Sequence, residues 1–237
     1  MSMLGFIYML AASPTLLILS LFCFVLAMWA QMKVKGAFNR AKRIRVQSGF
    51  SGAETAEEIL RAFQIDDVRI EPVRGFLSDH YDPTRKVLRL SPDVYQGRSL
   101  AAVGIAAHEV GHAIQHATRY APLALRNGIV PLASVGSGLS FILIIAGLIL
   151  RFPPLAIVGL ILFGTVVLFQ LVNLPVEFNA SSRARDILVG HGIVTVEEDK
   201  VVGQVLNAAA MTYIAATITA VLHLLYYATL VFGGARD

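Results

Sequence analysis

Four long stretches without acidic or basic side chains dominate the hydrophobic pattern of the 237-residue chain. Residues 4–30, 128–150 and 152–176 contain no Asp, Glu, Lys or Arg, and residues 208–232 carry only His223 as a titratable imidazole. Each stretch reaches the ~20 residues that a helix needs to cross a bilayer core. One such stretch also suits a buried core helix, but a chain of this length cannot bury four of them. The pattern therefore predicts four transmembrane helices.

The segment between the first two stretches has the mixed pattern of a small folded domain. A capping box at residues 51–54 (SGAE) opens an amphipathic helix. Residues 68–73 and 86–90 alternate between polar and hydrophobic side chains, which predicts two strands, and residues 75–83 between them are rich in turn formers. Helical sequence resumes at residue 91. We expect a helix, a small sheet and a second helix in that order.

The basic residues lie beside the hydrophobic stretches and indicate their orientation. Six of them follow the first stretch: Lys33, Lys35, Arg40, Lys42, Arg43 and Arg45. This order differs from that of a cleaved signal peptide, whose basic residues come first. Further Lys and Arg precede the second stretch and separate the third from the fourth, whereas the turn at residues 151–154 has one. The positive-inside rule then places the domain in the cytoplasm and both termini outside.

Composition excludes several classes of protein. The hydrophobic share of 56% is too high for an ordinary soluble domain. The net charge of +4 is accounted for by orientation and by contact with the lipid bilayer. No phosphate-binding loop or basic-aromatic pattern points to nucleic acid, and the single Cys23 excludes an intramolecular disulfide.

The chemistry of the chain is indicated by residues 108–112, which read HEVGH. Two residues four apart lie on one face of a helix, so His108 and His112 can reach one Zn²⁺ at roughly 2.0–2.1 Å. Glu109 can face the attacking water as a general base. An HExxH motif also arises by chance in packed or solvated helices, but alanine-rich helical flanks and Gly111 favour a zinc hydrolase.

A catalytic zinc needs a third protein ligand, and Glu177 is the favoured candidate. It follows the third hydrophobic stretch, with the pattern of a helix that starts at Pro175, and would return to the same side of the membrane as His108. The competing interpretation is an ordinary first-turn glutamate that the helix dipole favours.

The other histidines are weaker candidates for the metal. His116 continues the spacing of four, but it lies about 12 Å along the helix from His108, too far to share one tetrahedral ion. We expect it to support the site or to lie at the surface. His80 lies in the turn-rich segment, His191 in a loop-like stretch, and His223 is expected to face the interior of the helix bundle.

With these motifs the chain resembles the YugP-type neutral zinc metallopeptidases of bacterial membranes. The matching segments are residues 77–83, 108–115, 174–181 and 211–216. The resemblance implies an integral-membrane, gluzincin-like peptidase, related in plan to the HtpX-like membrane proteases and located in the bacterial inner or plasma membrane. It also implies His108, His112 and Glu177 as metal ligands. Asn179 stands where an aspartate is common in the family, which leaves the supporting role of that position open.

The expected activity is that of a zinc-dependent metalloendopeptidase with one Zn²⁺ per chain. Zinc lowers the pKa of a water molecule, and Glu109 moves the proton from this water to the leaving amine. Tyr213 is the preferred donor to the oxyanion, although an interfacial tyrosine is an equally good interpretation, and His80 is the alternative donor. The backbone of a protein or peptide substrate, from a membrane protein or an unfolded chain, could pair with the strand at residues 86–90.

The predicted fold class is thus an α-helical integral membrane protein with four transmembrane helices and a small α+β, zincin-like cytoplasmic catalytic domain. Its expected parts are transmembrane helix 1 (residues 1–31), the cytoplasmic domain with the HExxH helix (32–127), transmembrane helices 2 (128–151) and 3 (152–174), a cytoplasmic helical segment with the third ligand (175–207), transmembrane helix 4 (208–232) and a tail (233–237). Substrate identity, regulators and oligomeric state stay open.

Three other functions account for part of the sequence. An intramembrane site-2-type protease would carry the HExxH motif inside a spanning helix, but only about eight apolar residues precede His108. A membrane scaffold with a structural zinc is disfavoured by the intact Glu109 and by an open fourth position on the metal. A transporter would need polar residues within its spans, which are nearly free of charge.

Overall fold

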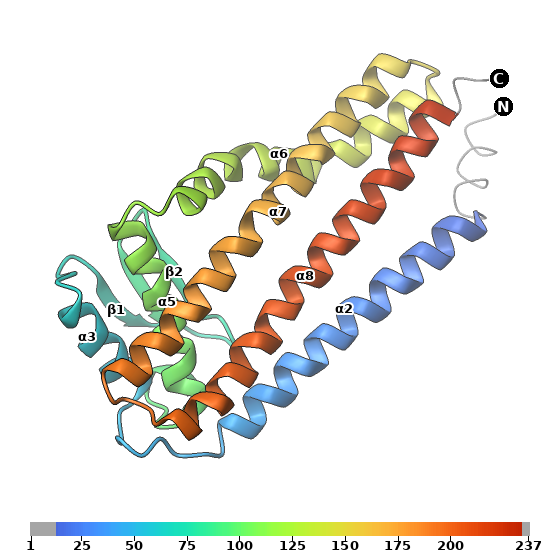
Figure 1. Cartoon of the computed structure of the whole chain (residues 1–237). Coiled ribbons are helices and arrows are strands. Elements are labelled where there is room, and N and C mark those ends of the chain that lie inside the picture. The colour runs from blue at the N-terminus through green and yellow to red at the C-terminus, as the bar shows by residue number, and fades with distance from the viewer. Residues whose placement is uncertain (1–12, 234–237) are drawn as a thin grey trace. The chain divides into compact units, whose positions relative to one another are not determined.

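A computed structural model describes residues 13–233 of the chain. The beginning of the predicted helix 1–31 and most of the predicted tail 233–237 lie outside this range. The described helices are α2 (Pro14–Ala41), α3 (Gly52–Ala62), α4 (Pro92–Tyr95), α5 (Leu100–Ala117), α6 (Ala121–Ile149), α7 (Pro153–Gly190) and α8 (Val196–Gly233). The strands are β1 (Arg69–Pro72), β2 (His80–Asp82) and β3 (Val87–Leu90), and the chain is mostly helical (Figure 1).

Four of the described helices, α2, α6, α7 and α8, are long and apolar enough to cross a membrane, which confirms the prediction of four long apolar helices. Two of them continue well beyond their hydrophobic stretch, since α7 and α8 each have 38 residues. The prediction that a helix starts at Pro175 is wrong, because this proline lies inside α7. A proline removes a single backbone donor, and a long apolar helix tolerates that loss when its neighbours satisfy the freed carbonyl.

The chain divides into two compact units, and their boundaries fall within these four helices. The first unit contains residues 13–29, 125–173 and 213–233 of the described chain. The second unit contains Ala30–Ala124 and Leu174–Thr212. The second unit therefore combines α3, α4, α5 and the sheet with one end of each long helix.

In the first unit α6 and α7 approach each other closely at glycines. A Cβ atom on Gly147 would lie 2.4 Å from the backbone N of Ala156, and one on Gly159 would lie 2.7 Å from the carbonyl oxygen of Ser140. Small residues at such contacts let two helices gain dispersion energy in a lipid environment, where no hydrophobic effect drives them together. The glycines therefore set the packing of this hairpin.

The second unit contains a three-stranded sheet in the order β1-β3-β2, with β1 parallel and β2 antiparallel to β3. The sheet corrects two predictions. Residues 80–82 form an edge strand, although they were predicted as part of a turn. The strand predicted at residues 86–90 is central and is paired on both sides, so it cannot also pair with a substrate.

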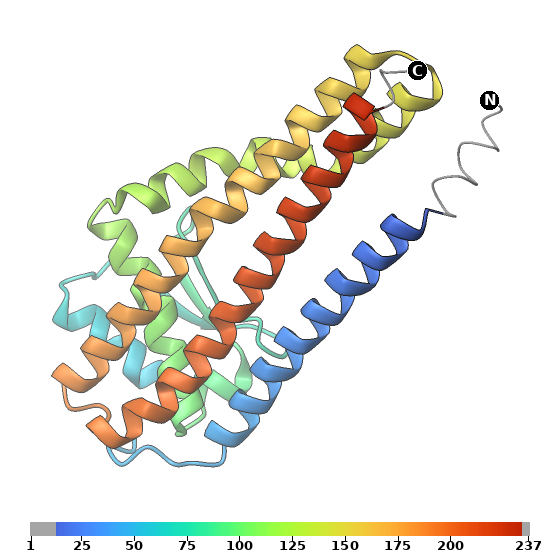
Figure 2. The same cartoon turned by 45° about the vertical axis from the view of Figure 1, so that its right-hand side comes forward.

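Helix α5 runs through the core of the second unit and is buried along most of its length. Its N-cap is Ser99, whose hydroxyl accepts a hydrogen bond from the Ala102 N–H. The buried side chains of α3 and of the sheet pack on α5. In Figures 1 and 2 the last turns of α7 lie against the same helix. The capping box predicted for α3 is present, because Ser51 and Glu54 exchange side-chain and backbone hydrogen bonds.

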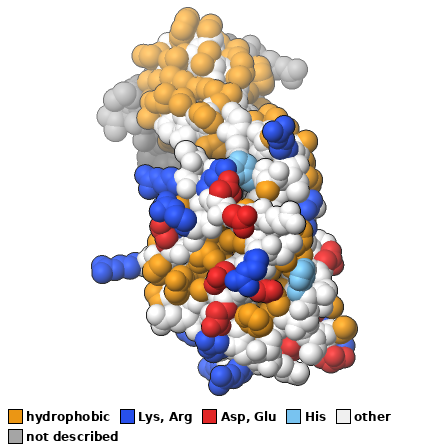
Figure 3. Space-filling view, turned by 90° about the vertical axis from the view of Figure 1, so that its left-hand side faces the viewer, with side chains coloured by type: hydrophobic (Ala, Val, Ile, Leu, Met, Phe, Trp, Pro, Cys, Tyr) orange, Lys and Arg blue, Asp and Glu red, His pale blue; other side chains and the backbone are white. Residues whose placement is uncertain are grey.

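Acidic and basic side chains are interspersed on the face that Figure 3 shows. Examples of pairs in the second unit are Arg61 with Glu57 and Glu58, at 3.2 Å each, and Arg98 with Glu54 at 2.8 Å. Exposed pairs of this kind contribute little to stability. The packing around α5 therefore stabilises the second unit more than these charges do.

We expect Gly147→Leu to destabilise the protein in detergent, because a side chain at this position collides with the backbone of α7. Overpacking lowers the free energy of unfolding by about 1–3 kcal/mol, which would lower the Tm by several degrees. Gly138→Leu is the matched control, since a Cβ on Gly138 of the same helix meets nothing within 4 Å. Equal thermal shifts for the two variants would contradict this account of the α6–α7 contact.

Candidate metal centre

The structure brings His108 and His112 of α5 together with Glu177 of α7. Their ligand atoms all lie within 4.8 Å of one another. Glu177 Oε2 lies 3.3 Å from His108 Nε2 and 3.5 Å from His112 Nε2. The imidazole rings of His108 and His112 meet edge to face, with centroids 4.8 Å apart. The three side chains are nearly buried and converge on one point.

This convergence depends on a close contact between the backbones of α5 and α7. A Cβ on Gly111 would lie 2.9 Å from the carbonyl oxygen of Ala180 and 3.2 Å from its Cα. Gly111 lies between the two histidines of α5, and Ala180 lies about one turn after Glu177 on α7. A side chain at position 111 would push the helices apart, so this glycine keeps the third side chain within reach of the other two.

The geometry and the donor types of the three residues fit a zinc ion. Two donors at about 2.0–2.1 Å from one tetrahedral ion lie about 3.3 Å apart. The separations of 3.3 and 3.5 Å between Glu177 Oε2 and the two Nε2 atoms match this value. Glu177 Oε2 is also buried and accepts no hydrogen bond, which is costly for a carboxylate oxygen unless a cation is bound.

Hydrogen bonds hold both imidazoles with Nε2 toward this point. His112 Nδ1 lies 3.0 Å from Gln115 Oε1, and His108 Nδ1 lies 3.1 Å from Ser181 Oγ. An amide oxygen only accepts hydrogen bonds, so the hydrogen of neutral His112 lies on Nδ1 and the lone pair on Nε2. This is the tautomer that a metal ligand needs.

Glu109 lies beside this group and is buried, with 8% of its surface exposed. Burial raises the pKa of its carboxyl, and Glu177 and Asp79 raise it further, while His108 and His112 oppose the shift. A raised pKa is suited to a group that accepts a proton and then returns it near neutral pH.

The group of three His and Glu ligands does not include His80. His80 is exposed on β2, where its Nδ1 lies 2.8 Å from Ser78 O and its Nε2 lies 3.4 Å from Arg89 Nη1. Tyr213 belongs to α8 in the first unit. The roles of His80 and Tyr213 as oxyanion donors stay predictions.

His116 joins β2 to α5, because its Nδ1 lies 2.8 Å from the hydroxyl oxygen of Tyr81. Burial, with a smaller effect of Asp67 and Asp82, raises the pKa of Tyr81 to about 12. The phenol therefore keeps its hydrogen and can donate it to His116. The contact ties the edge strand to the helix that carries His108 and His112.

The remaining two histidines make contacts of their own. The His191 ring lies 6.4 Å from the ring of Phe63, and His223 Nδ1 lies 2.8 Å from the carbonyl oxygen of Thr219. Neither belongs to the group of three.

Two residues that the sequence analysis did not single out contact the histidines directly. Gln115 lies three positions after His112, and Ser181 lies four positions after Glu177. Both spacings place the side chain on the helical face of the neighbouring ligand. Helical periodicity could therefore have identified them, once each helix had been assigned.

Comparison with known proteins gives a consistent result. A family model described as "Putative neutral zinc metallopeptidase" matches residues 16–232. A curated protein of Bacillus subtilis (strain 168), named "Putative membrane protease YugP", is 48% identical over 212 residues, which cover 90% of this chain and 94% of that protein. No solved structure matches the chain.

We expect purified protein to contain about one Zn²⁺ per chain, and each of His108→Ala, His112→Ala and Glu177→Ala to reduce that content sharply. Metal analysis of protein washed with a weak chelator provides the measurement. His116→Ala is the control, since His116 bonds Tyr81 instead of joining the group. Full zinc content in Glu177→Ala would remove Glu177 from the ligand set.

Proposed function

Since the chain belongs to the neutral zinc metallopeptidase family, as its sequence motifs predicted, we propose that it is a membrane-bound zinc endopeptidase that cleaves peptide bonds at the membrane–cytoplasm boundary. The observation that supports the proposal most is the convergence of His108, His112 and Glu177 next to the buried Glu109. This set has two nitrogen donors and one oxygen donor and leaves a fourth position open for a water molecule or a substrate.

The proposed chemistry divides the work between the metal and the protein. A zinc ion held by His108, His112 and Glu177 would act as a Lewis acid and lower the pKa of water. Glu109 then accepts the proton of the attacking water and delivers it to the leaving amine. Tyr213, with His80 as the alternative, is proposed to donate a hydrogen bond to the oxyanion.

The sheet suggests where an extended substrate binds. The outer edge of β2 has no strand partner among the described residues, and the Tyr81–His116 contact of 2.8 Å ties β2 to α5. An extended backbone can add to such an edge through main-chain hydrogen bonds, with little demand on its sequence. We therefore propose β2, in place of the strand at residues 86–90, as the strand that receives the substrate.

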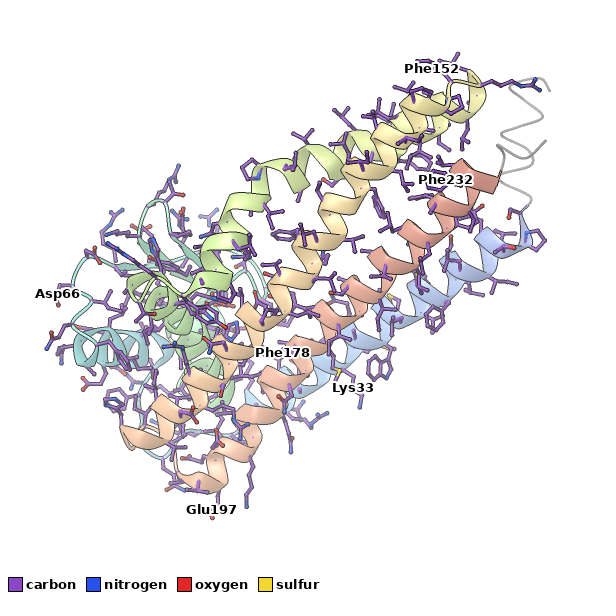
Figure 4. The ribbon with its side chains drawn as sticks, turned by 45° about the horizontal axis from the view of Figure 1, so that its top comes forward. Lys33, Asp66, Phe152, Phe178, Glu197 and Phe232 are labelled. Carbon is purple, nitrogen blue, oxygen red and sulfur yellow. The ribbon has the colours of Figure 1, made fainter. Side chains whose placement is uncertain are left out.

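The position of Glu177 along α7 favours substrates at the membrane. The uncharged stretch of this helix ends at Val176, directly before the proposed ligand. Phe178, which follows it and is labelled in Figure 4, is 45% exposed. Apolar surface beside the ligand suits segments of membrane proteins, or unfolded chains at the bilayer, better than soluble globular proteins.

We expect Glu109→Gln to bind zinc and fold normally but to lose proteolysis by at least ~10²-fold, because an amide cannot accept the proton of water. Candidate substrates are identified by comparing the membrane proteomes of cells that carry the wild-type protein or this variant. Cleavage of each candidate by the two proteins is then measured in native membranes. If the wild type cleaves nothing that the variant spares, a scaffold with a structural zinc replaces the peptidase.

Cysteine labelling tests the proposed orientation. Cys23 is the only cysteine, so its replacement by serine gives a background for single-cysteine variants. We expect Ser48→Cys to resist a membrane-impermeant reagent in intact cells and Phe152→Cys to react, because the Lys and Arg bias places residue 48 inside. A permeant reagent should label both. The opposite pattern would move the site to the other side of the membrane.

A further inference from the structure

Gln115 is a fully buried amide whose hydrogen bonds connect both helices of the candidate metal centre. Its side chain has 0% exposure. Its Oε1 lies 3.0 Å from His112 Nδ1, and its Nε2 donates to the carbonyl oxygen of Val176 at 2.8 Å and to Asn179 Oδ1 at 3.0 Å. One side chain of α5 thus contacts a histidine on its own helix and two residues of α7.

These contacts fix the orientation of the amide. The Val176 carbonyl can only accept a hydrogen bond, so the atom facing it is the NH₂ group of Gln115. The amide oxygen must then face His112, which places the histidine hydrogen on Nδ1. Both amide hydrogens are used, and no rotation of the group preserves all three contacts.

The chain of hydrogen bonds continues beyond Gln115. Arg183 Nε donates to Asn179 Oδ1 at 2.8 Å, and the Arg183 guanidinium lies 6.0 Å from the centre of the Tyr120 ring. Asn179 therefore accepts from Gln115 on one side and from Arg183 on the other. An uncharged amide is sufficient at position 179, because the group that accepts from the histidine is Gln115 and not residue 179.

We propose that Gln115 is the positioning residue of the zinc site. It holds His112 with Nε2 toward the ion and ties this histidine to Val176, the residue directly before Glu177. Ligands on two different helices are thereby set relative to each other by one buried amide, and Asn179 and Arg183 keep that amide in place. The inference rests on the proposed zinc function of the site.

The test measures zinc affinity of the detergent-purified full-length protein by competition with a chromophoric chelator. Gln115→Met keeps the size of the side chain and removes all three hydrogen bonds, so we expect affinity to fall by about 10–100-fold. Asn179→Leu should weaken zinc binding, because Gln115 loses one of its acceptors. Asn179→Asp still accepts from Gln115 and Arg183 and should keep wild-type affinity. Thr55→Val is the control, because Thr55 is equally buried and its hydroxyl has no hydrogen-bond partner.

Two further measurements separate positioning from a general loss of structure. The absorption spectrum of the Co²⁺-loaded protein should change in Gln115→Met and stay unchanged in Thr55→Val, because only the former lets His112 rotate. The double variant Gln115→Met/Asn179→Leu should bind zinc no more weakly than Gln115→Met alone. The effects of two substitutions in one hydrogen-bond network are not additive, because Asn179 acts only through Gln115.

The outcomes distinguish this inference from the proposed function. If the wild type itself binds no zinc, the function fails. If the wild type binds zinc and His112→Ala does not, while Gln115→Met has wild-type affinity and the wild-type Co²⁺ spectrum, only the positioning role of Gln115 is overturned. Additive losses in the double variant would overturn the part assigned to Asn179.

Discussion

The contact between the backbones of α5 and α7 is the constraint on which the site depends. Because residue 111 is a glycine, the carbonyl oxygen of Ala180 can lie 2.9 Å from where a Cβ would be, which is closer than a real Cβ would allow. Only at this separation can Glu177 reach the face of α5 that carries the histidines. The glycine of the HEVGH motif therefore has a geometric role of its own, because it lets α7 lie close enough to α5 for Glu177 to meet the two histidines.

Burial gives the site its electrostatic character. Glu109 and Glu177 are 8% and 4% exposed, so two carboxylates lie in a region where an uncompensated charge is costly. A divalent cation held by Glu177 and the imidazoles would offset part of that cost, and a metal that binds only the folded state would stabilise it by mass action. Metal binding would then be linked to folding of the second unit, and the raised pKa of Glu109 results from the same lack of water.

The sequence was sufficient where the signal is periodic and local. Long uncharged stretches predicted the four apolar helices, the spacing of four placed His108 and His112 on one face, and residues 51–54 predicted a capping box that is present. It failed where the signal is weak or not local. The strand β2 has three residues, too few for an alternating pattern, and which strand lies at the edge depends on pairing between distant segments. Likewise, the bond from Gln115 to Val176 spans 61 positions.

The shortness of β2 has a consequence for how such an enzyme would select its substrates. An edge of three residues offers few main-chain groups, because only alternate residues of a strand point their N–H and C=O outward. An extended peptide would therefore gain little affinity there. A substrate chain confined to the same bilayer does not need high affinity, because confinement raises its effective concentration at the site. A linker has the same effect on two tethered modules. Residence in the membrane would then do more than sequence to decide which chains are cut.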